Sequence, residues 1–180
     1  MTDHVAVVTG AGGGIGRAVC AELGVAFPSV RSLGREFDVR KPPYALACDV
    51  LVCCHAAPAD TDFRDVIEVD LVGTYNVCKA TLPHMISQGY GRIVTFSSIR
   101  AHAPRPGQVA YAAAKAGVEG LTRALAVEYG PQGIQVNCVA PGAVLTPRTV
   151  ENIRRGVVSE AELKARTPTG RLTTPEEVAR

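Results

Sequence analysis

Tyr111 and Lys115 stand four residues apart in the alanine-rich segment YAAAK. On an α-helix such residues share one face, with Cβ atoms about 5–6 Å apart. A free phenol titrates near pH ~10, and an ammonium group close by stabilises its phenolate form. The pair could therefore act as a general acid or base. Taken alone, it is more typical of a solvated helix face.

A glycine-rich stretch, TGAGGGIG from Thr9 to Gly16, follows the first β-rich run. Glycines allow a tight turn and a close approach of the backbone to a pyrophosphate, and the amides of the following helix attract negative charge. Such turns also serve merely to make room for packing. The position after the first strand of an alternating chain favours dinucleotide binding.

Hydrophobic patterning predicts strands that alternate with helices. Strands are expected at residues 4–9, 29–33, 36–39, 48–54, 91–97 and 133–140. Helices are expected from Ile15 to a C-cap at Gly24, over 63–87 with a bend at Pro83, over 108–129, and from Thr174 onward. Residues 147–172 are polar and charged. This alternation predicts an α/β fold with a doubly wound parallel sheet.

Composition is that of an ordinary globular protein. The 180 residues are expected to form one domain, 1–180, and they are 47% hydrophobic and 20% charged, with a net charge of +2. This balance predicts no nucleic-acid or membrane partner, and no apolar run approaches the roughly 18 residues of a membrane span. The N-terminus has no signal-peptide pattern. Six cysteines without a CxxC spacing predict buried thiols in a reducing, cytoplasmic setting and no metal site.

Four motifs occur together in one order: TGAGGGIG, Ser98 thirteen residues before Tyr111, YAAAK and VNCVAPG. In this order and spacing they resemble the short-chain dehydrogenase/reductase family. The resemblance extends over nearly the whole chain, from Val5 to PTGRLTTPEEVA. It implies a Rossmann-like fold and an NAD(P)-dependent oxidoreductase that interconverts a ketone and a secondary alcohol.

The resemblance also implies roles for single residues. Tyr111 would be the general acid or base, and Ser98 would hydrogen-bond the substrate oxygen. Lys115 would stabilise the phenolate and hold the nicotinamide ribose. The family usually has asparagine in a helix segment that supports a proton relay to this lysine, whereas this chain has Asp70 in VDLVG. Aspartate still accepts hydrogen bonds but adds a charge, so a modified relay is expected.

For the cofactor, the resemblance implies a larger set of residues. They are Thr9, Gly10, Gly14, Ile15, Gly16, Arg35, Asp38, Val39, Cys53, Tyr111, Lys115, Pro141, Gly142 and Thr146. Within this set, Thr146 would meet the nicotinamide carboxamide or simply cap the helix that begins at Pro147. Asp38 and Val39 resemble the pair beside the adenine.

Three further departures from the family pattern stand out. The loop after the fourth family strand reads CCHA, from Cys53 to Ala56, where the family has NNAG. His55 is therefore expected to be a structural neighbour of the cofactor. The segment from Gly16 to Cys53 is short, and the chain ends at Arg180, before the family's usual last helix and strand. The expected sheet is accordingly shortened, and the domain is either a minimal member or incomplete.

Cofactor and substrate preferences follow from basic residues. Arg35, after the second strand, favours NADP over NAD slightly, although a merely solvated arginine is nearly as much expected there. Arg100, His102 and Arg105 lie in the loop AHAPRPG and its flanks, and the segment 147–171 has six basic against three acidic side chains. These suggest an anionic substrate, either an acyl thioester on a phosphopantetheine arm or a carboxylate, since AHAPRPG resembles the loop of dihydrodiol dehydrogenases. A merely solvated lid is equally expected.

The family resemblance further implies a homodimer that packs through the helices at 63–87 and 108–129. One competing interpretation is a non-catalytic nucleotide-binding relic of a reductase, supported by CCHA, Asp70 and the short C-terminus. Another is an epimerase or dehydratase on the same scaffold, which is less expected because such enzymes usually have longer chains.

Overall fold

The computed structural model describes residues 4–58 and 61–180 and contains one parallel sheet of five strands. The strands are β1 (Val5–Thr9), β2 (Ser29–Leu33), β3 (Val50–Cys53), β4 (Gly91–Phe96) and β5 (Ile134–Val139). Their order in the sheet is β2-β1-β3-β4-β5, so the direction of winding reverses beside β1. Ligands of such sheets bind at the carboxyl ends of the strands where the order reverses. The predicted doubly wound α/β fold is confirmed.

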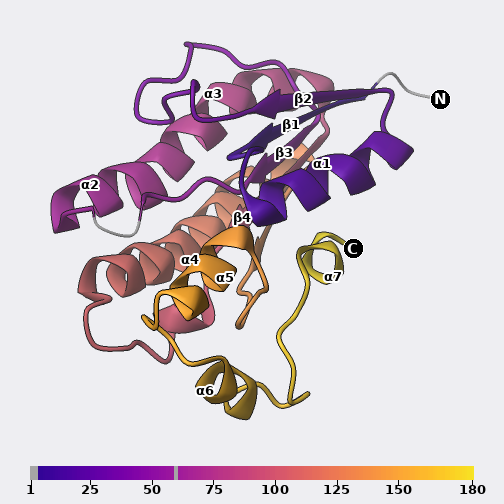
Figure 1. Cartoon of the computed structure of the whole chain (residues 1–180). Helices are drawn as coiled ribbons and strands as arrows, with labels where there is room; N and C mark the ends of the chain where they lie inside the picture. The colour runs from indigo at the N-terminus through magenta and orange to yellow at the C-terminus, as the bar shows by residue number, and fades with distance from the viewer. Residues whose placement is uncertain (1–3, 59–60) are drawn as a thin grey trace.

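Helices cover both faces of the sheet (Figure 1). On one face, α1 (Gly14–Ala26) lies beside α7 (Pro175–Ala179), and the two share a core cluster with β1 and β3. On the other face lie α2 (Phe63–Ile67), α3 (Gly73–Gln88) and α4 (Val109–Tyr129). Because β3 is covered on both faces, all four of its residues are buried, which explains its unbroken apolar sequence.

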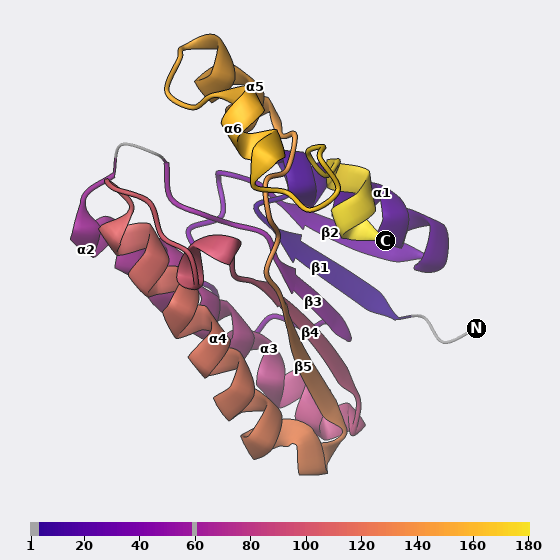
Figure 2. The same cartoon turned by 90° about the horizontal axis from the view of Figure 1, so that it is seen from below.

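Two short helices, α5 (Pro147–Arg154) and α6 (Glu160–Ala165), lie beyond the carboxyl ends of the strands (Figure 2). The segment that contains these two helices begins and ends at the same place. Val144 and Thr173 form a parallel bridge there, and the Leu145 N–H donates to Thr173 O at 2.8 Å. Residues 146–172 are therefore a closed excursion above the sheet, which we call the lid.

Two local predictions were wrong. Residues 36–39 form turns and no strand, and Glu36 folds back so that its Oε1 accepts from the Gly34 N–H at 2.9 Å. The first helix also continues past Gly24 to Ala26. Its end is set by Phe27, which precedes a proline and is extended, because a residue before proline is pushed out of the α region.

The long helical pattern over 63–87 is confirmed, with one interruption. A π-helical turn, Glu68–Val72, joins α2 to α3, and α3 continues through Pro83 to a left-handed cap at Gly89 with φ 62°. Within the described chain, β5 is an edge strand of the sheet. Among the described residues, no helix has the length and apolar character that crossing a bilayer requires.

Candidate active site

Tyr111 and Lys115 lie on one face of α4. The helix begins at Val109, and its alanines favour this conformation. The Lys115 Nζ lies 5.6 Å from the centroid of the Tyr111 ring. Tyr111 is partly buried, whereas Lys115 is only 4% exposed. The shared face is confirmed, and a buried ammonium excludes the alternative of a solvated helix face.

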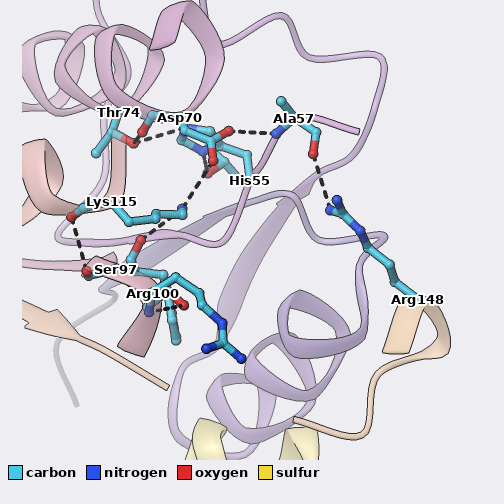
Figure 3. Close-up of polar contacts among 11 residues, drawn as sticks. His55, Ala57, Asp70, Thr74, Ser97, Arg100, Lys115 and Arg148 are labelled. Atoms are coloured by element: carbon cyan, nitrogen blue, oxygen red, sulfur yellow. Dashed lines mark hydrogen bonds and ion pairs between the residues drawn. The ribbon is translucent and has the colours of Figure 1, made fainter. Parts of the chain in front are cut away.

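The ammonium group of Lys115 is held between β4 and the helical segment opposite. Its Nζ donates to Phe96 O at 3.0 Å and lies 3.6 Å from Oδ2 of Asp70 (Figure 3). Asp70 is 1% exposed. Because a buried charge is tolerated only when it is paired, Asp70 is the counter-ion of Lys115.

The π-helical turn positions Asp70. Such turns displace backbone carbonyls from the helical ladder and often occur at functional sites. Here the Asp70 carbonyl accepts from Thr74 Oγ1 at 2.7 Å, and its Oδ1 accepts from the Ala57 N–H at 2.6 Å. Arg148 of the lid donates to Ala57 O at 3.3 Å. A chain of contacts thus connects the lid to Asp70 and Lys115 (Figure 3). The other carboxylate oxygen of Asp70, Oδ2, has no hydrogen bond within the described chain.

His55 links the glycine turn to α3. Its Nδ1 lies 2.6 Å from Thr9 Oγ1, and its Nε2 lies 3.2 Å from Thr74 Oγ1. Burial, together with the nearby charge of Lys115, lowers the pKa of His55 to about 3. The ring is therefore neutral and structural, in agreement with the sequence-based expectation. Sequence reasoning missed both partners, because Thr9 is 46 residues away in the chain and no local pattern joins them.

Ser98 lies just beyond the carboxyl end of β4 and is 8% exposed. Its Oγ accepts from the Arg100 N–H at 3.2 Å, which leaves the hydroxyl hydrogen available to a ligand oxygen. The preceding Ser97 has its Oγ 3.1 Å from Lys115 O and 2.7 Å from Glu119 Oε1. Ser97 therefore attaches α4 to the end of β4, so that Ser98 and Lys115 are placed by one rigid junction.

The glycine turn between β1 and α1 requires glycine at closely packed positions and leaves the start of α1 uncapped. Gly10 has φ 64°, and a Cβ there would lie 2.5 Å from the backbone N of His55. A Cβ on Gly14 would lie 2.9 Å from the Cβ of Thr146. Gly13 supplies no side-chain cap, so the first amides of α1 are open to an anion. These residues fit the diphosphate of a dinucleotide.

The loop after β5 faces this turn. Thr146 caps α5, with its Oγ1 accepting from the Thr149 N–H at 3.2 Å, and it packs against Gly14. Pro141 O accepts from the Ile99 N–H at 3.0 Å, which joins this loop to the Ser98 region. The structure thus brings Thr146 beside the glycine turn and shows the predicted capping role.

Other residues of the predicted cofactor set lie elsewhere. Thr9, Val39 and Cys53 are buried, at 0%, 6% and 2% exposure. Asp38 is exposed and is paired with Arg40, at 2.9 Å from Nε. In the structure, the side chain of Thr9 holds His55, and that of Cys53 belongs to the core. Of the remaining members, Ile15 is partly buried against the core, Gly16 is buried, and Gly142 is exposed.

Comparison with known proteins agrees with this architecture. A family model described as enoyl-(acyl carrier protein) reductase matches residues 48–180. Acetoacetyl-CoA reductase of Cupriavidus necator is 32% identical over 221 residues, which cover 99% of this chain and 89% of that protein. The aligned stretch is longer than this chain, in agreement with internal shortening.

Two further matches were found. Cis-4-hydroxycyclohexanecarboxylate dehydrogenase of Sinomonas cyclohexanicum is 47% identical over 117 residues, covering 65% of this chain and 46% of that protein. The solved structure of ElxO with NADP bound has a TM-score of 0.83 and 25% identity, and covers 99% of this chain and 89% of that one. Since both the family model and a relative of similar extent match most of its length, this chain is a member of the short-chain dehydrogenase/reductase family, NAD(P)-dependent oxidoreductases acting on CH–OH groups.

Proposed function

We propose that this oxidoreductase interconverts a ketone and a secondary alcohol on an anionic substrate, with NADP(H) preferred and Tyr111 as the acid–base group. The observation that supports this most is the placement of Tyr111 over a buried, paired ammonium, since Lys115 Nζ lies 5.6 Å from its ring centroid. A purely structural helix face would not require a charge at this depth.

In this proposal each residue acts on a stated atom. The nicotinamide, when bound, donates or accepts the hydride at the carbinol carbon. Tyr111 gives its phenolic proton to the carbonyl oxygen during reduction and takes the hydroxyl proton during oxidation. Ser98 Oγ donates to the same oxygen and orients it. Lys115 stabilises the phenolate and would hold the nicotinamide ribose, while Asp70 keeps Lys115 in place.

The preference for NADP rests on Arg35. It is the second residue after β2, which pairs with β1 directly before the glycine turn. Arg35 is exposed and has no hydrogen bond or ion pair within residues 4–58 and 61–180. The nearby acid, Glu36, folds back on the Gly34 N–H and so is not extended toward a ribose. A free guanidinium at this edge suits a phosphate.

Replacing Arg35 with alanine is expected to raise the Kd for NADPH about 10- to 100-fold, because a charge-assisted contact is lost. The Kd for NADH should change by less than about twofold. The chain has no tryptophan, so titration can follow reduced-cofactor fluorescence. The matched control is Arg40→Ala, whose guanidinium is already paired with Asp38. Equal weakening of both cofactors would contradict the assignment.

The anionic substrate is supported by charge and by the relatives. The relatives named above act on a coenzyme A thioester and on a cyclohexanecarboxylate, both anionic molecules. The lid and the loop after Ser98 are rich in arginine, which binds carboxylates and phosphates with a planar fork. This chain is proposed to use such an arginine for the anionic group of its own substrate.

We also propose that the protein is a homodimer through the helices over 63–87 and 108–129. Large apolar side chains are exposed on these helices at Phe63, Tyr75, Val109 and Val127. Burying such surface in a partner favours association. Light scattering is expected to give twice the 18.9 kDa mass of the chain, and Val127→Glu, 80% exposed in one chain, should shift the mass to that of a monomer. A monomeric wild-type mass would exclude the dimer.

A further inference from the structure

The structure separates the basic residues of the lid and the preceding loop into occupied and unoccupied groups. Five have partners: His102 with Glu119, Arg154 with Glu151, Lys164 with Glu160, Arg171 with Glu177, and Arg148 with Ala57 O. Arg105, Arg155 and Arg166 have no ion pair in the described chain, and Arg100 uses only Nη1, which donates to Ala103 O at 3.1 Å. A ligand anion would therefore meet these four arginines and not the whole basic surface. Of the four, Arg100 and Arg105 lie in the loop after Ser98.

Arg105 stands out among them. Its Nε and Nη2 are buried, and neither has a hydrogen-bond partner within the described residues. Guanidinium nitrogens that are removed from water without a partner are costly, so such atoms in folded proteins usually have a ligand or a water as partner. Gln108, three residues later, has a buried Oε1 that is also without a partner. Rotation of that amide would present its NH2 donors in place of the oxygen.

The positive charges of two other arginines act on Arg100. Burial, followed by the charges of Arg105 and Arg166, lowers the pKa of Arg100. No carboxylate of the described chain pairs with any of them, although the lid contains glutamates that pair with other bases. A bound anion would relieve this repulsion and satisfy the two orphaned nitrogens at once.

The loop that carries Arg100 and Arg105 joins Ser98 to the start of α4. The Arg100 N–H donates to Ser98 Oγ, at one end of the loop. At the other end, the Gln108 N–H donates to Arg105 O at 3.1 Å, and Tyr111 follows in the first turn of α4. Figure 3 shows the Arg100 side chain extending from this loop away from Lys115. An anionic group held here would belong to the molecule whose oxygen Ser98 and Tyr111 address.

We propose that Arg105, assisted by Arg100 and Arg166, forms a subsite for the carboxylate of a small oxo or hydroxy acid. The inference rests on the proposed function and specifies which part of the site recognises the substrate. The planar fork of Arg105 presents Nε and Nη2 side by side, which matches the two oxygens of a carboxylate. Arg100 and Arg166 would add charge, and the lid residue Arg166 would link binding to the position of the lid.

The test uses the full chain saturated with NADP⁺ and cyclohexanecarboxylate as the probe, with cyclohexanecarboxamide as its neutral counterpart. Calorimetry is expected to show that the wild type binds the carboxylate at least about 10-fold more tightly than the amide. Arg105→Leu should abolish this difference, and Arg105→Lys, which keeps the charge but not the fork, should restore it in part. The matched control Arg154→Ala, in which an already paired lid arginine is removed, should bind like the wild type.

A second measurement does not depend on binding. Because Nε and Nη2 of Arg105 are buried without a partner among the described residues, Arg105→Leu should melt at the same temperature as the unliganded wild type or higher. A lower melting temperature would mean that the guanidinium already has a partner, and would overturn the proposal. Three other results would also overturn the proposal. The wild type could bind carboxylate and amide equally, Arg105→Leu could bind the carboxylate as the wild type does, or inorganic phosphate could stabilise the protein while the carboxylate does not.

Failure of this subsite is distinguishable from failure of the proposed function. If the wild type binds NADPH and reduces neutral ketones but does not discriminate the probe from its amide, the subsite and the anionic substrate are wrong, while the oxidoreductase proposal stands. If a folded wild type binds no reduced cofactor in the fluorescence titration, the oxidoreductase proposal itself is wrong, and carboxylate binding would then belong to another activity.

Discussion

The Tyr111→Phe variant is expected to retain the wild-type Kd for NADPH and to lose about 100- to 10,000-fold in kcat, the usual contribution of a positioned acid or base. Phenylalanine keeps the ring that lies 5.6 Å from Lys115 Nζ, so packing and the helix face are preserved. Only the phenolic proton is removed. The measurements are steady-state rates with a ketone and a fluorescence titration with NADPH.

The matched control is Tyr129→Phe, which removes a phenol from the far end of the same helix. It should turn over like the wild type. If Tyr111→Phe were as active as this control, Tyr111 would not be the acid–base group. A wild type that binds NADPH but reduces no ketone would instead favour the non-catalytic relic that CCHA and Asp70 suggest.

The second large effect is expected at Lys115. Lys115→Met should lower the free energy of unfolding by about 3–5 kcal/mol, the cost of leaving a buried charge without its partner. Asp70 is 1% exposed, and its Oδ2 has no hydrogen bond among the described residues, so no other group can compensate it. Phe96 O also loses its donor at 3.0 Å. Urea denaturation measures the change.

A double-mutant cycle separates the ion pair from general loss of packing. Adding Asp70→Asn to Lys115→Met should recover a large part of the lost stability, because the amide oxygen still accepts from the Ala57 N–H at 2.6 Å and no buried charge remains. Asp70→Asn alone should destabilise the protein, since Lys115 then stays charged without a partner. If the free-energy changes of the two single variants add up to that of the double variant within about 0.5 kcal/mol, the contact between Lys115 and Asp70 at 3.6 Å contributes no coupling energy.

By itself, the sequence determined the order of strands and helices, the shared face of Tyr111 and Lys115, and the place of the glycine turn. These follow from short-range rules: the 3.6-residue helical period, unbroken apolar runs in covered strands, and glycine where a turn demands it. The long pattern over 63–87 was strong enough to survive a π-helical turn and Pro83. The local pattern did not predict the turns at 36–39 or the continuation of the first helix past Gly24. At both places the competing backbone conformations differ little in intrinsic propensity.

Only the tertiary structure decided which polar groups are buried and with what partners. His55 meets Thr9 and Thr74, 46 and 19 residues away, and Asp70 meets Lys115 across two helical segments. Likewise, Arg154 and Lys164 of the lid are paired with glutamates, whereas two buried nitrogens of Arg105 have no partner in the described chain. The physical reason is that the energy of a charge or donor depends on its burial and on the groups facing it, and packing brings those groups from distant parts of the chain.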